Sequence, residues 1–230
     1  LPPDFTSVLV SVAILILPAV LIARQPDLGT ALLVAVSGGF ALFLSGLQWR
    51  VIFGMGVLAL AAAPALWFVM HDYQRQRVLT FLDPESDPLG SGWNIIQSKI
   101  AVGSGGLFGK GWMNGTQSRL EFIPERHTDF ILAVLSEEFG LVGVLLLFAL
   151  YLYIAGRCLY IAAMARFTYA RLLAGALGLT FFVYVLVNAG MVSGLLPVVG
   201  VPLPLVSYGG TSIVTLLAGF GILMSIYGHR

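Results

Sequence analysis

Long runs of apolar residues, separated by short polar breaks, dominate the chain. A helix that crosses a bilayer takes about 20 such residues, with a range of about 17–25. The long runs do not alternate apolar and polar positions with a period of two, so they predict helices rather than membrane β-strands. Six runs are long enough, and they predict six transmembrane helices at 7–23, 31–47, 51–70, 131–156, 172–193 and 211–227.

Two other parts of the chain depart from this pattern. Residues 194–210 are apolar, but Pro197, Pro202 and Pro204 prevent a regular helix there. Irregular apolar backbone at membrane depth is tolerated only inside protein or beside a cavity, so we expect a re-entrant loop beside a lipid-binding groove. Residues 71–130 hold most of the charged residues together with enough apolar ones to bury a surface. They predict a large ordered loop with a short amphipathic helix, 94–102, at the membrane interface.

Composition agrees with this pattern and narrows the function classes. Of the 230 residues, 58% are hydrophobic and 10% are charged, whereas a soluble domain carries about 25% charged residues. We therefore expect an all-α integral membrane protein, a polytopic helical bundle in which residues 1–230 form a single transmembrane domain. The net charge of +1 gives no reason to expect a nucleic-acid partner. The single cysteine, Cys158, excludes an internal disulfide, and no metal-ligand spacing surrounds His127.

The distribution of basic residues predicts the orientation in the membrane. With six crossings, the linkers 48–50 and 157–171 and the tail 228–230 lie on one side, and they carry arginines but no acid. Such an excess of Lys and Arg marks the cytoplasmic side. The C-terminus is therefore expected in the cytoplasm, and the loop 71–130 on the periplasmic or extracellular face. The chain begins with Leu1 and shows no signal peptide, so we expect an N-terminal part to precede it.

Residues 121–129 concentrate ionisable groups at the edge of the fourth apolar run. A charged group costs free energy where the membrane edge leaves it poorly hydrated, and proteins usually keep charged groups there for function. If residues 124–129 open the fourth helix, Glu125 and Asp129 are i, i+4 neighbours on one face. Two like charges so close raise one pKa, which suits that carboxyl group to general acid–base catalysis. A solvated helix N-terminus explains the same spacing, and the spacing alone does not separate the two hypotheses.

A glycine-rich run covers residues 103–111. It is not a P-loop, because Ser104 and Gly111 stand where that motif needs Gly and then Ser or Thr. The run is either a flexible turn or a surface of backbone N–H groups that a pyrophosphate approaches closely, with Lys99 and Lys110 adding positive charge.

Two shorter polar groups leave alternatives open. Asp27, in the turn that follows Arg24, either caps the next helix or joins Arg24 in a site on the outer face. Glu137 and Glu138 lie about one-third of the way into the membrane if the fourth span begins at 131, and they must then face the protein interior or a wet cavity. If that span begins at 139, they lie at the headgroups.

Several motifs follow one another through almost the whole chain. They are QPDLGTA (25–31), FLDP (81–84), GWNIIQS (92–98), GGLFGKGW (105–112), PERHTDF (124–130), EEFG (137–140) and PLPLVSYGG (202–210). With these motifs the chain resembles the family of shape, elongation, division and sporulation (SEDS) proteins. The arginine of PERHTDF and the run QSK favour the RodA branch of that family over FtsW.

The resemblance implies a fold, an activity and a site. The six predicted helices would be the last six of ten. The protein would be a peptidoglycan glycosyltransferase of the bacterial inner membrane that polymerises lipid II, a disaccharide peptide on undecaprenyl pyrophosphate, during cell elongation and cell-shape maintenance. Asp129 would be the general base of an inverting displacement of polyprenyl pyrophosphate. The candidates for substrate binding are Glu125, Arg126, His127, Lys99, Lys110, Arg119, Arg24, Asp27 and Ser207.

The resemblance also implies partners. These are a class B penicillin-binding protein, which is a transpeptidase, and other proteins of the cell-elongation complex. No resident cofactor or protein-held metal is expected, although a divalent cation would help to neutralise the pyrophosphate.

Two other functions compete with the transferase. A lipid II flippase would use Glu137, Glu138 and the broken segment 194–210 as a polar path for the headgroup. A scaffold would only recruit a cell-wall partner. The flippase is the weaker hypothesis, because the ionisable groups gather on one face of the membrane.

Overall fold

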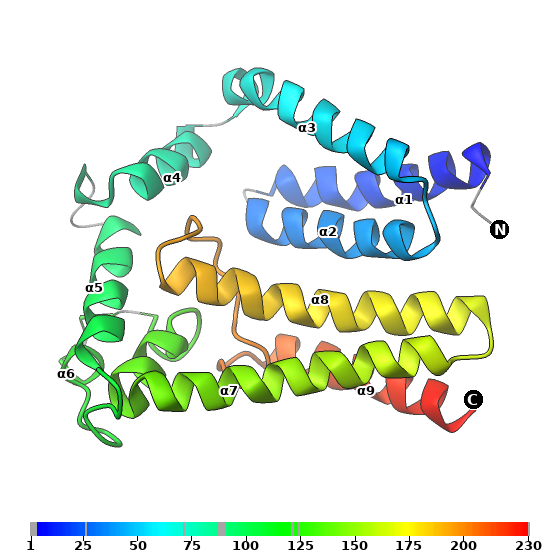
Figure 1. Ribbon diagram of the computed structural model, residues 1–230. Helices are drawn as coiled ribbons and strands as arrows, with labels where there is room; N and C mark the ends of the chain where they lie inside the picture. The colour runs from blue at the N-terminus through cyan, green and yellow to red at the C-terminus, as the bar shows by residue number, and fades with distance from the viewer. Residues whose placement is uncertain are drawn as a thin grey trace.

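The computed structural model describes residues 4–25, 27–70, 72–86, 91–120, 122–123 and 125–229 (Figure 1). Every regular element within these ranges is a helix, which confirms the all-α fold class. The elements are α1 (Phe5–Ala23), α2 (Leu28–Leu44), α3 (Trp49–Val69), α4 (Asp72–Leu82), η1 (Pro84–Ser86), α5 (Ser91–Ser104), α6 (Thr116–Arg119), α7 (Ile131–Met164), α8 (Thr168–Val192) and α9 (Gly210–Gly228). Glu121, Pro124 and Arg230, which contributed to the sequence argument, lie outside the described residues.

Each of the six predicted apolar runs forms a helix. Four helices, α1, α7, α8 and α9, are long and apolar enough to cross a membrane. The other two are α2, which has 17 residues, and α3, which spans Trp49–Val69 and has a described apolar stretch at Trp49–Leu58. The chain is therefore a multi-pass membrane protein by composition and helix length, and the six crossings stay a prediction.

The fourth run is longer than the sequence predicted. Helix α7 continues to Met164, so the linker expected at 157–171 is reduced to residues 165–167. The helix continues because the residues after Arg157 stay apolar. The Arg157 guanidinium does not interrupt it, since it lies over the ring of Tyr160, 5.3 Å from the ring centroid, on the helix surface.

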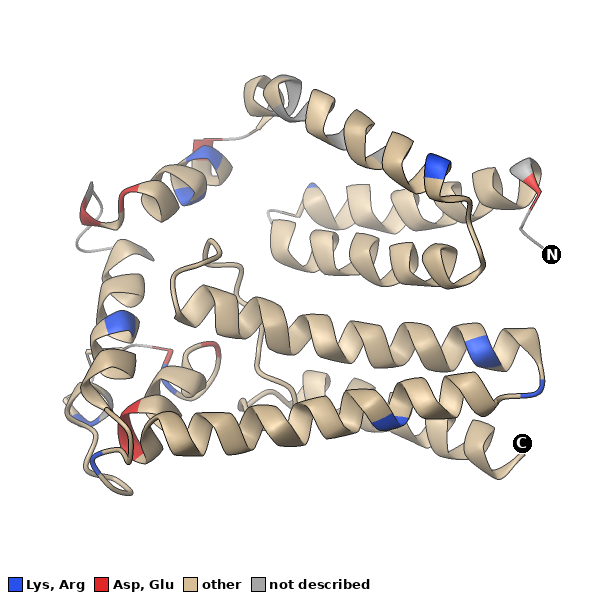
Figure 2. Cartoon of the chain, viewed as in Figure 1, with Lys and Arg blue, Asp and Glu red and all other residues tan. Residues whose placement is uncertain are grey.

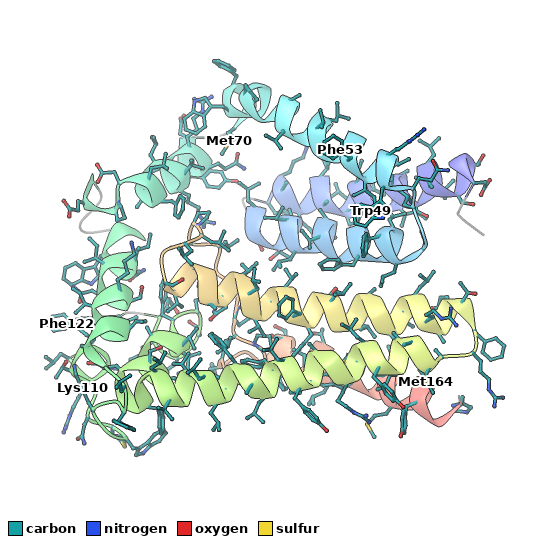
Figure 3. The ribbon with its side chains drawn as sticks, in the orientation of Figure 1. Trp49, Phe53, Met70, Lys110, Phe122 and Met164 are labelled. Atoms are coloured by element: carbon teal, nitrogen blue, oxygen red, sulfur yellow. The ribbon has the colours of Figure 1, made fainter. Side chains whose placement is uncertain are left out.

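Helices α7 and α8 run antiparallel side by side, α2 packs against α8, and α1 packs against α2 (Figure 1). Helix α3 is drawn apart from this group, and Trp49 and Phe53 are exposed on it (Figure 3). The main core lies between α7, α8 and α9, where Phe181 stacks edge-on against Tyr151 with 5.8 Å between ring centroids. The Tyr151 hydroxyl donates to the Pro204 carbonyl oxygen at 2.7 Å, which ties the segment after α8 into the core.

Two segments at one end of the bundle position the polar residues. Helix α5 lies across the ends of α7 and α8 (Figure 1) and contains the predicted helix 94–102. It is anchored by Ser98, whose hydroxyl donates to the Val192 carbonyl oxygen at 2.9 Å. Residues 195–209, between α8 and α9, are non-helical, as their prolines predicted.

The charged residues gather at the two ends of the bundle (Figure 2). Long uncharged stretches separate these ends in α1, α2, α7 and α8. The end that holds α4, α5 and α6 carries several acids and bases together, whereas the end that holds the α7–α8 linker carries arginines and, before α1, Asp4. This is the distribution from which the sequence argument derived the two faces of the membrane.

Candidate functional site

Asp129 lies in a turn, not in a helix. The sequence left open whether the residues before 131 open the fourth helix; α7 begins at Ile131, where the fourth apolar run was predicted to begin, and residues 125–130 form a turn. The amide of Phe130 donates back to the Glu125 carbonyl oxygen at 3.1 Å, and the Thr128 hydroxyl donates to the Glu125 carboxylate at 2.7 Å. Such side-chain hydrogen bonds give the backbone an alternative to the helix.

The turn is held from outside by bonds to three successive carbonyl groups. The amide of Tyr208 donates to His127 at 2.9 Å, and the Ser207 hydroxyl donates to Thr128 at 2.6 Å. The side-chain amide of Asn188, in α8, donates to Asp129 at 2.8 Å. Bonds from other segments thus hold residues 127–129 in the turn, and α7 begins two residues after Asp129, at the predicted start of the fourth apolar run.

The Asp129 carboxyl group is partly buried. Burial raises its pKa, and the charge of Glu125 raises it further. The expected coupling of Glu125 to Asp129 is therefore present, although the two residues lie in a turn. A carboxyl group with a raised pKa that still reaches the surface is a candidate acid–base catalyst.

The Asp129 carboxylate lies beside Gly200. A Cβ atom at Gly200 would be 3.5 Å from Asp129 Oδ2, and Gly200 adopts φ = +75°, which favours glycine. Gly200 also lines a cavity of about 470 Å³ between α2, α8 and α9, together with Thr30 and Tyr184. The carboxylate therefore lies next to a space that reaches from the outer turns into the helical bundle.

The turn before α2 reaches the same place from the other side. Gly29 packs against the carbonyl group of Val199, next to Gly200. Asp27 caps α2 by accepting a hydrogen bond from the Thr30 amide at 3.0 Å, which confirms its expected capping role. Hydrogen bonding with Thr30 lowers the pKa of Asp27 despite partial burial, and the charge of Arg77 adds a smaller lowering contribution. Arg24 is exposed at the end of α1.

The remaining residues of the Asp129 turn face outward. Glu125 and His127 are exposed, and Arg126 is partly exposed. The Arg126 guanidinium donates from Nε to His127 Nε2 at 3.1 Å. Ser207 is buried, and besides donating to Thr128 it accepts from the Leu203 amide at 2.7 Å, so its hydroxyl contacts backbone on both sides.

Lys110 lies elsewhere, at the N-terminal end of α7 (Figure 3). Its ammonium group forms an ion pair with the fully buried Glu137, with 2.7 Å between Nζ and Oε1. The Glu137 carboxylate also accepts from the amides of Thr116 and Gln117 at 2.7 and 3.1 Å. This network holds α6 against α7, and it assigns Glu137 to the protein interior.

The other two candidate cations do not converge on Asp129 in one group. Lys99 is exposed on α5, and its side chain lies against Gly194 at the end of α8. Arg119 is exposed at the end of α6. Among the described residues, no cluster of three His, Cys, Asp or Glu side chains is arranged to hold a metal ion.

Sequence reasoning missed Asn188. This residue is fully buried, and its Nδ2 donates both to Asp129 and to the Val201 carbonyl oxygen at 2.7 Å. Its Oδ1 is buried and has no hydrogen-bond partner within the described part of the chain. The available signal was a lone amide side chain in an apolar run, since polar groups inside a membrane span are usually functional.

Comparison with known proteins identifies the family. The model of the cell cycle protein family of FtsW, RodA and SpoVE matches residues 2–230, which is almost the whole chain. The chain belongs to the FtsW/RodA/SpoVE family. The resemblance drawn from the sequence motifs is thereby confirmed.

Members of the family from several bacteria are similar to the chain. The peptidoglycan glycosyltransferase MrdB of Escherichia coli is 64% identical over 230 residues, which are 100% of this chain and 62% of that protein. The probable peptidoglycan glycosyltransferase FtsW of Geobacter metallireducens is 42% identical over 217 residues, covering 92% of this chain and 57% of that protein. The chain thus spans about three fifths of the length of the curated relatives it matches.

Solved structures of the family share the fold. One, described as the structural coordination of polymerization and crosslinking by a peptidoglycan synthase complex, has a TM-score of 0.77 at 37% identity, over 97% of this chain and 61% of that chain. The crystal structure of the rod shape determining protein RodA of Thermus thermophilus has a TM-score of 0.66 at 28% identity, over 100% of this chain and 59% of that chain.

Proposed function

We propose that the protein is a peptidoglycan glycosyltransferase that polymerises lipid II into glycan strands during cell elongation and cell-shape maintenance. The names of its relatives support this activity. The observation that carries the proposal is the position of Asp129, partly buried beside Gly200 at the edge of a cavity, with burial and Glu125 both raising its pKa.

In the proposed mechanism Asp129 is the general base. Its carboxylate removes the proton from the 4-hydroxyl of the acceptor sugar, and the oxygen attacks the anomeric carbon of the donor. The bond from that carbon to the polyprenyl pyrophosphate breaks with inversion, and the pyrophosphate leaves with the bonding electrons. Base catalysis contributes about 10²–10⁴-fold, and holding two lipid-anchored substrates in line contributes much of the rest.

The leaving group needs positive charge. Arg126 lies in the same turn as Asp129, and its position favours it for contact with the pyrophosphate. Arg24, Lys99 and Arg119 are exposed on neighbouring elements and remain candidates. Lys110 is the least favoured of the set, because its ammonium group is paired with Glu137.

The proposed setting is the bacterial inner membrane, crossed six times, with the C-terminus in the cytoplasm. In this arrangement α4, α5, α6 and the Asp129 turn lie on the outer face, where a lipid-linked sugar carries its own leaving group. Arg166 in the α7–α8 linker, with Arg157 and Arg171 in the adjoining parts of α7 and α8, supports this orientation. A class B penicillin-binding protein is the proposed partner, and the relative solved within a peptidoglycan synthase complex supports it.

The flippase hypothesis is less well supported, although the segment 195–209 that it uses is non-helical. It needs Glu137 as part of a polar path, but Glu137 is bound by Lys110, Thr116 and Gln117. The helix after Gly140 continues to Met164, which at about 1.5 Å per residue is enough to cross about 30 Å of hydrocarbon. Glu137 and Glu138 therefore belong at the headgroups rather than at mid-membrane.

The experiment is lipid II polymerisation by the full-length protein in proteoliposomes. The Asp129→Asn variant is expected to insert and fold but to form no glycan strands. Glu85→Gln, at an exposed acid in the outer segment away from the site, is the matched control and is expected to retain activity. Normal polymerisation by Asp129→Asn would refute the proposed base, and lipid II translocation without polymer would favour a flippase.

A further inference from the structure

The glycine-rich loop is bonded through its backbone to both sides of a break in α7. At Gly140 the helix has φ = 65° and ψ = −166°. The amides of Lys110 and Gly111 donate to Glu137 and Glu138, each at 3.0 Å. On the other side of the break, the amides of Leu141 and Val142 donate to Gly106 and Leu107 at 2.9 and 3.1 Å. These bonds fix the loop beside residues 137–142 of α7.

Glycine is required on both sides of this contact. A Cβ atom at Gly140 would be 2.7 Å from the Leu107 carbonyl oxygen, and one at Gly109 would be 2.6 Å from the Phe139 carbonyl carbon. Both residues also have positive φ. The loop is therefore neither a free turn nor an open cradle for a pyrophosphate, because the N–H groups of Lys110 and Gly111 are already bonded to α7.

Large apolar side chains project from this fixed loop. They form the loop-tip patch, which consists of Leu107, Phe108, Trp112 and Met113, with exposed fractions of 62%, 81%, 68% and 67%. Trp112 also touches α7, with 5.7 Å between its ring centroid and that of Phe139. A cluster of large exposed apolar side chains of this kind marks a surface that contacts a membrane or another protein.

The loop-tip patch continues the apolar outer surface of α7. Phe139, Leu141, Val142 and Leu145 are exposed on that helix, and α7 is one of the four helices long enough to cross a membrane. The only charged residue in 105–114 is Lys110. Its charge is turned inward to the buried Glu137, so the patch presents no unpaired charge to its surroundings.

We propose that the loop-tip patch inserts into the interfacial layer of the outer leaflet and sets the height of the Asp129 turn above the membrane. Aromatic side chains, Trp above all, favour the headgroup level. The loop transmits this height because it is bonded to residues 137–142 of α7, the helix that begins two residues after Asp129. The inference uses the proposed crossing of α7 and its orientation, and it does not depend on the glycosyltransferase activity.

The test measures how deeply the loop-tip patch enters the lipid bilayer. In full-length protein with its other cysteines replaced, including Cys158, Phe108→Cys is labelled with an environment-sensitive fluorophore. The protein is reconstituted in phosphatidylcholine–phosphatidylglycerol vesicles that contain lipids brominated at known depths. We expect the fluorophore at position 108 to be quenched by bromines near the headgroup end of the acyl chains. We expect aqueous iodide not to quench it. The matched label at Glu85→Cys is expected to show the reverse pattern.

A protein partner is the competing occupant of the patch. If the label at position 108 is quenched by iodide and not by lipid, and is protected only after a class B penicillin-binding protein is added, the proposal is overturned. A second variant, Phe108→Asp with Trp112→Asp, removes the apolar contact while leaving the loop backbone in place. It is expected to lose lipid quenching of a label at Leu107→Cys. Failure of the protein to polymerise lipid II would leave these readings unchanged.

Discussion

At the scale of single residues, the chemistry concentrates on Asp129 and the groups that hold it. Burial and the charge of Glu125 both disfavour its ionised form. A raised pKa makes the carboxylate a stronger base when it is ionised, which suits proton removal from a sugar hydroxyl. The same shift means that the folded state loses stability as pH rises through the raised pKa, because the folded state binds the proton more tightly than the unfolded chain.

The acid side of the pH profile tests this pKa. If Asp129 is the proposed general base, polymerisation needs its ionised carboxylate, and the rate should fall as pH drops through a value above the ordinary range for Asp. Glu125→Gln removes the second cause of the raised pKa of Asp129, which is the charge of Glu125. The acid side of the pH–rate profile should then move to lower pH, although burial still keeps the pKa above the ordinary value for Asp. The measurement is the initial rate against pH, with Glu85→Gln as the control. An unchanged acid limb in Glu125→Gln would contradict the coupling.

Asn188 is expected to position Asp129 without touching substrate. Asn188→Ala removes the bonds to Asp129 and Val201. We expect kcat to fall with little change in KM, because displacing a catalytic group by about 1 Å costs on the order of 10²-fold. Ser193→Ala, in the turn that ends α8, is the control, since its hydroxyl bonds only within its own helix. A raised KM at constant kcat would instead indicate a role in binding.

At the scale of elements, the break in α7 and the loop that wraps it depend on each other. Gly140 adopts backbone angles that are essentially restricted to glycine. The buried ion pair of Glu137 and Lys110 then joins the same loop to the same helix. These contacts fix the outer end of the helix that immediately follows Asp129.

Replacing Gly140 with Ala should unfold this end of the protein. The new methyl group would overlap the backbone of Leu107 and Gly109, which has no room to move. Gly156→Ala, on an exposed face of the same helix with nothing within 4 Å, is the matched control. It should be neutral, or stabilising by up to about 1 kcal/mol. Thermal unfolding in detergent measures the stability of both variants. Equal melting temperatures would contradict the proposed close contact between Gly140 and the glycine-rich loop.

The effects of substituting Lys110 and Glu137 on the unfolding free energy are expected to depend on each other. Lys110→Met leaves the buried Glu137 carboxylate uncompensated, and breaking a buried pair in this way costs about 3–5 kcal/mol. Adding Glu137→Gln should recover much of that loss, because the amide still accepts from Thr116 and Gln117. A double-mutant cycle of unfolding free energies checks this. If the two substitutions are simply additive, the pair does not stabilise the loop.

At the scale of the whole molecule, one end of the bundle carries the site and the other carries arginines (Figure 2). The orientation therefore decides whether Asp129 meets lipid-linked sugars on the outer face. This depends on the number of crossings, and α2 and α3 are the two helices whose crossing rests on the sequence pattern alone.

Cysteine accessibility tests the orientation in intact cells. A cysteine at Glu85 should react with a membrane-impermeant maleimide added from outside. A cysteine at Arg166, in the linker between α7 and α8, should react only after the cells are opened. The two positions lie at opposite ends of the bundle. Labelling of Arg166→Cys from outside would reverse the assigned faces and place Asp129 in the cytoplasm.

The sequence by itself determined the features that depend on neighbouring residues. The apolar runs determined the helices, because backbone groups in lipid must be satisfied within each segment. Prolines determined the irregular segment 194–210, and Asp27 determined the start of α2 through a bond to Thr30. Family motifs located Asp129, because the residues that carry the resemblance are contiguous there.

Only the tertiary structure decided the features that join distant residues. The bonds from Lys110 to Glu137, from Asn188 to Asp129 and from Ser207 to Thr128 span 27, 59 and 79 residues. They hold Thr128 and Asp129 in a turn ahead of α7, pair Lys110 with Glu137 and bring Asn188 into contact with Asp129. Burial, which raises the pKa of Asp129, is likewise a property of the packed neighbours, so no local pattern encodes it.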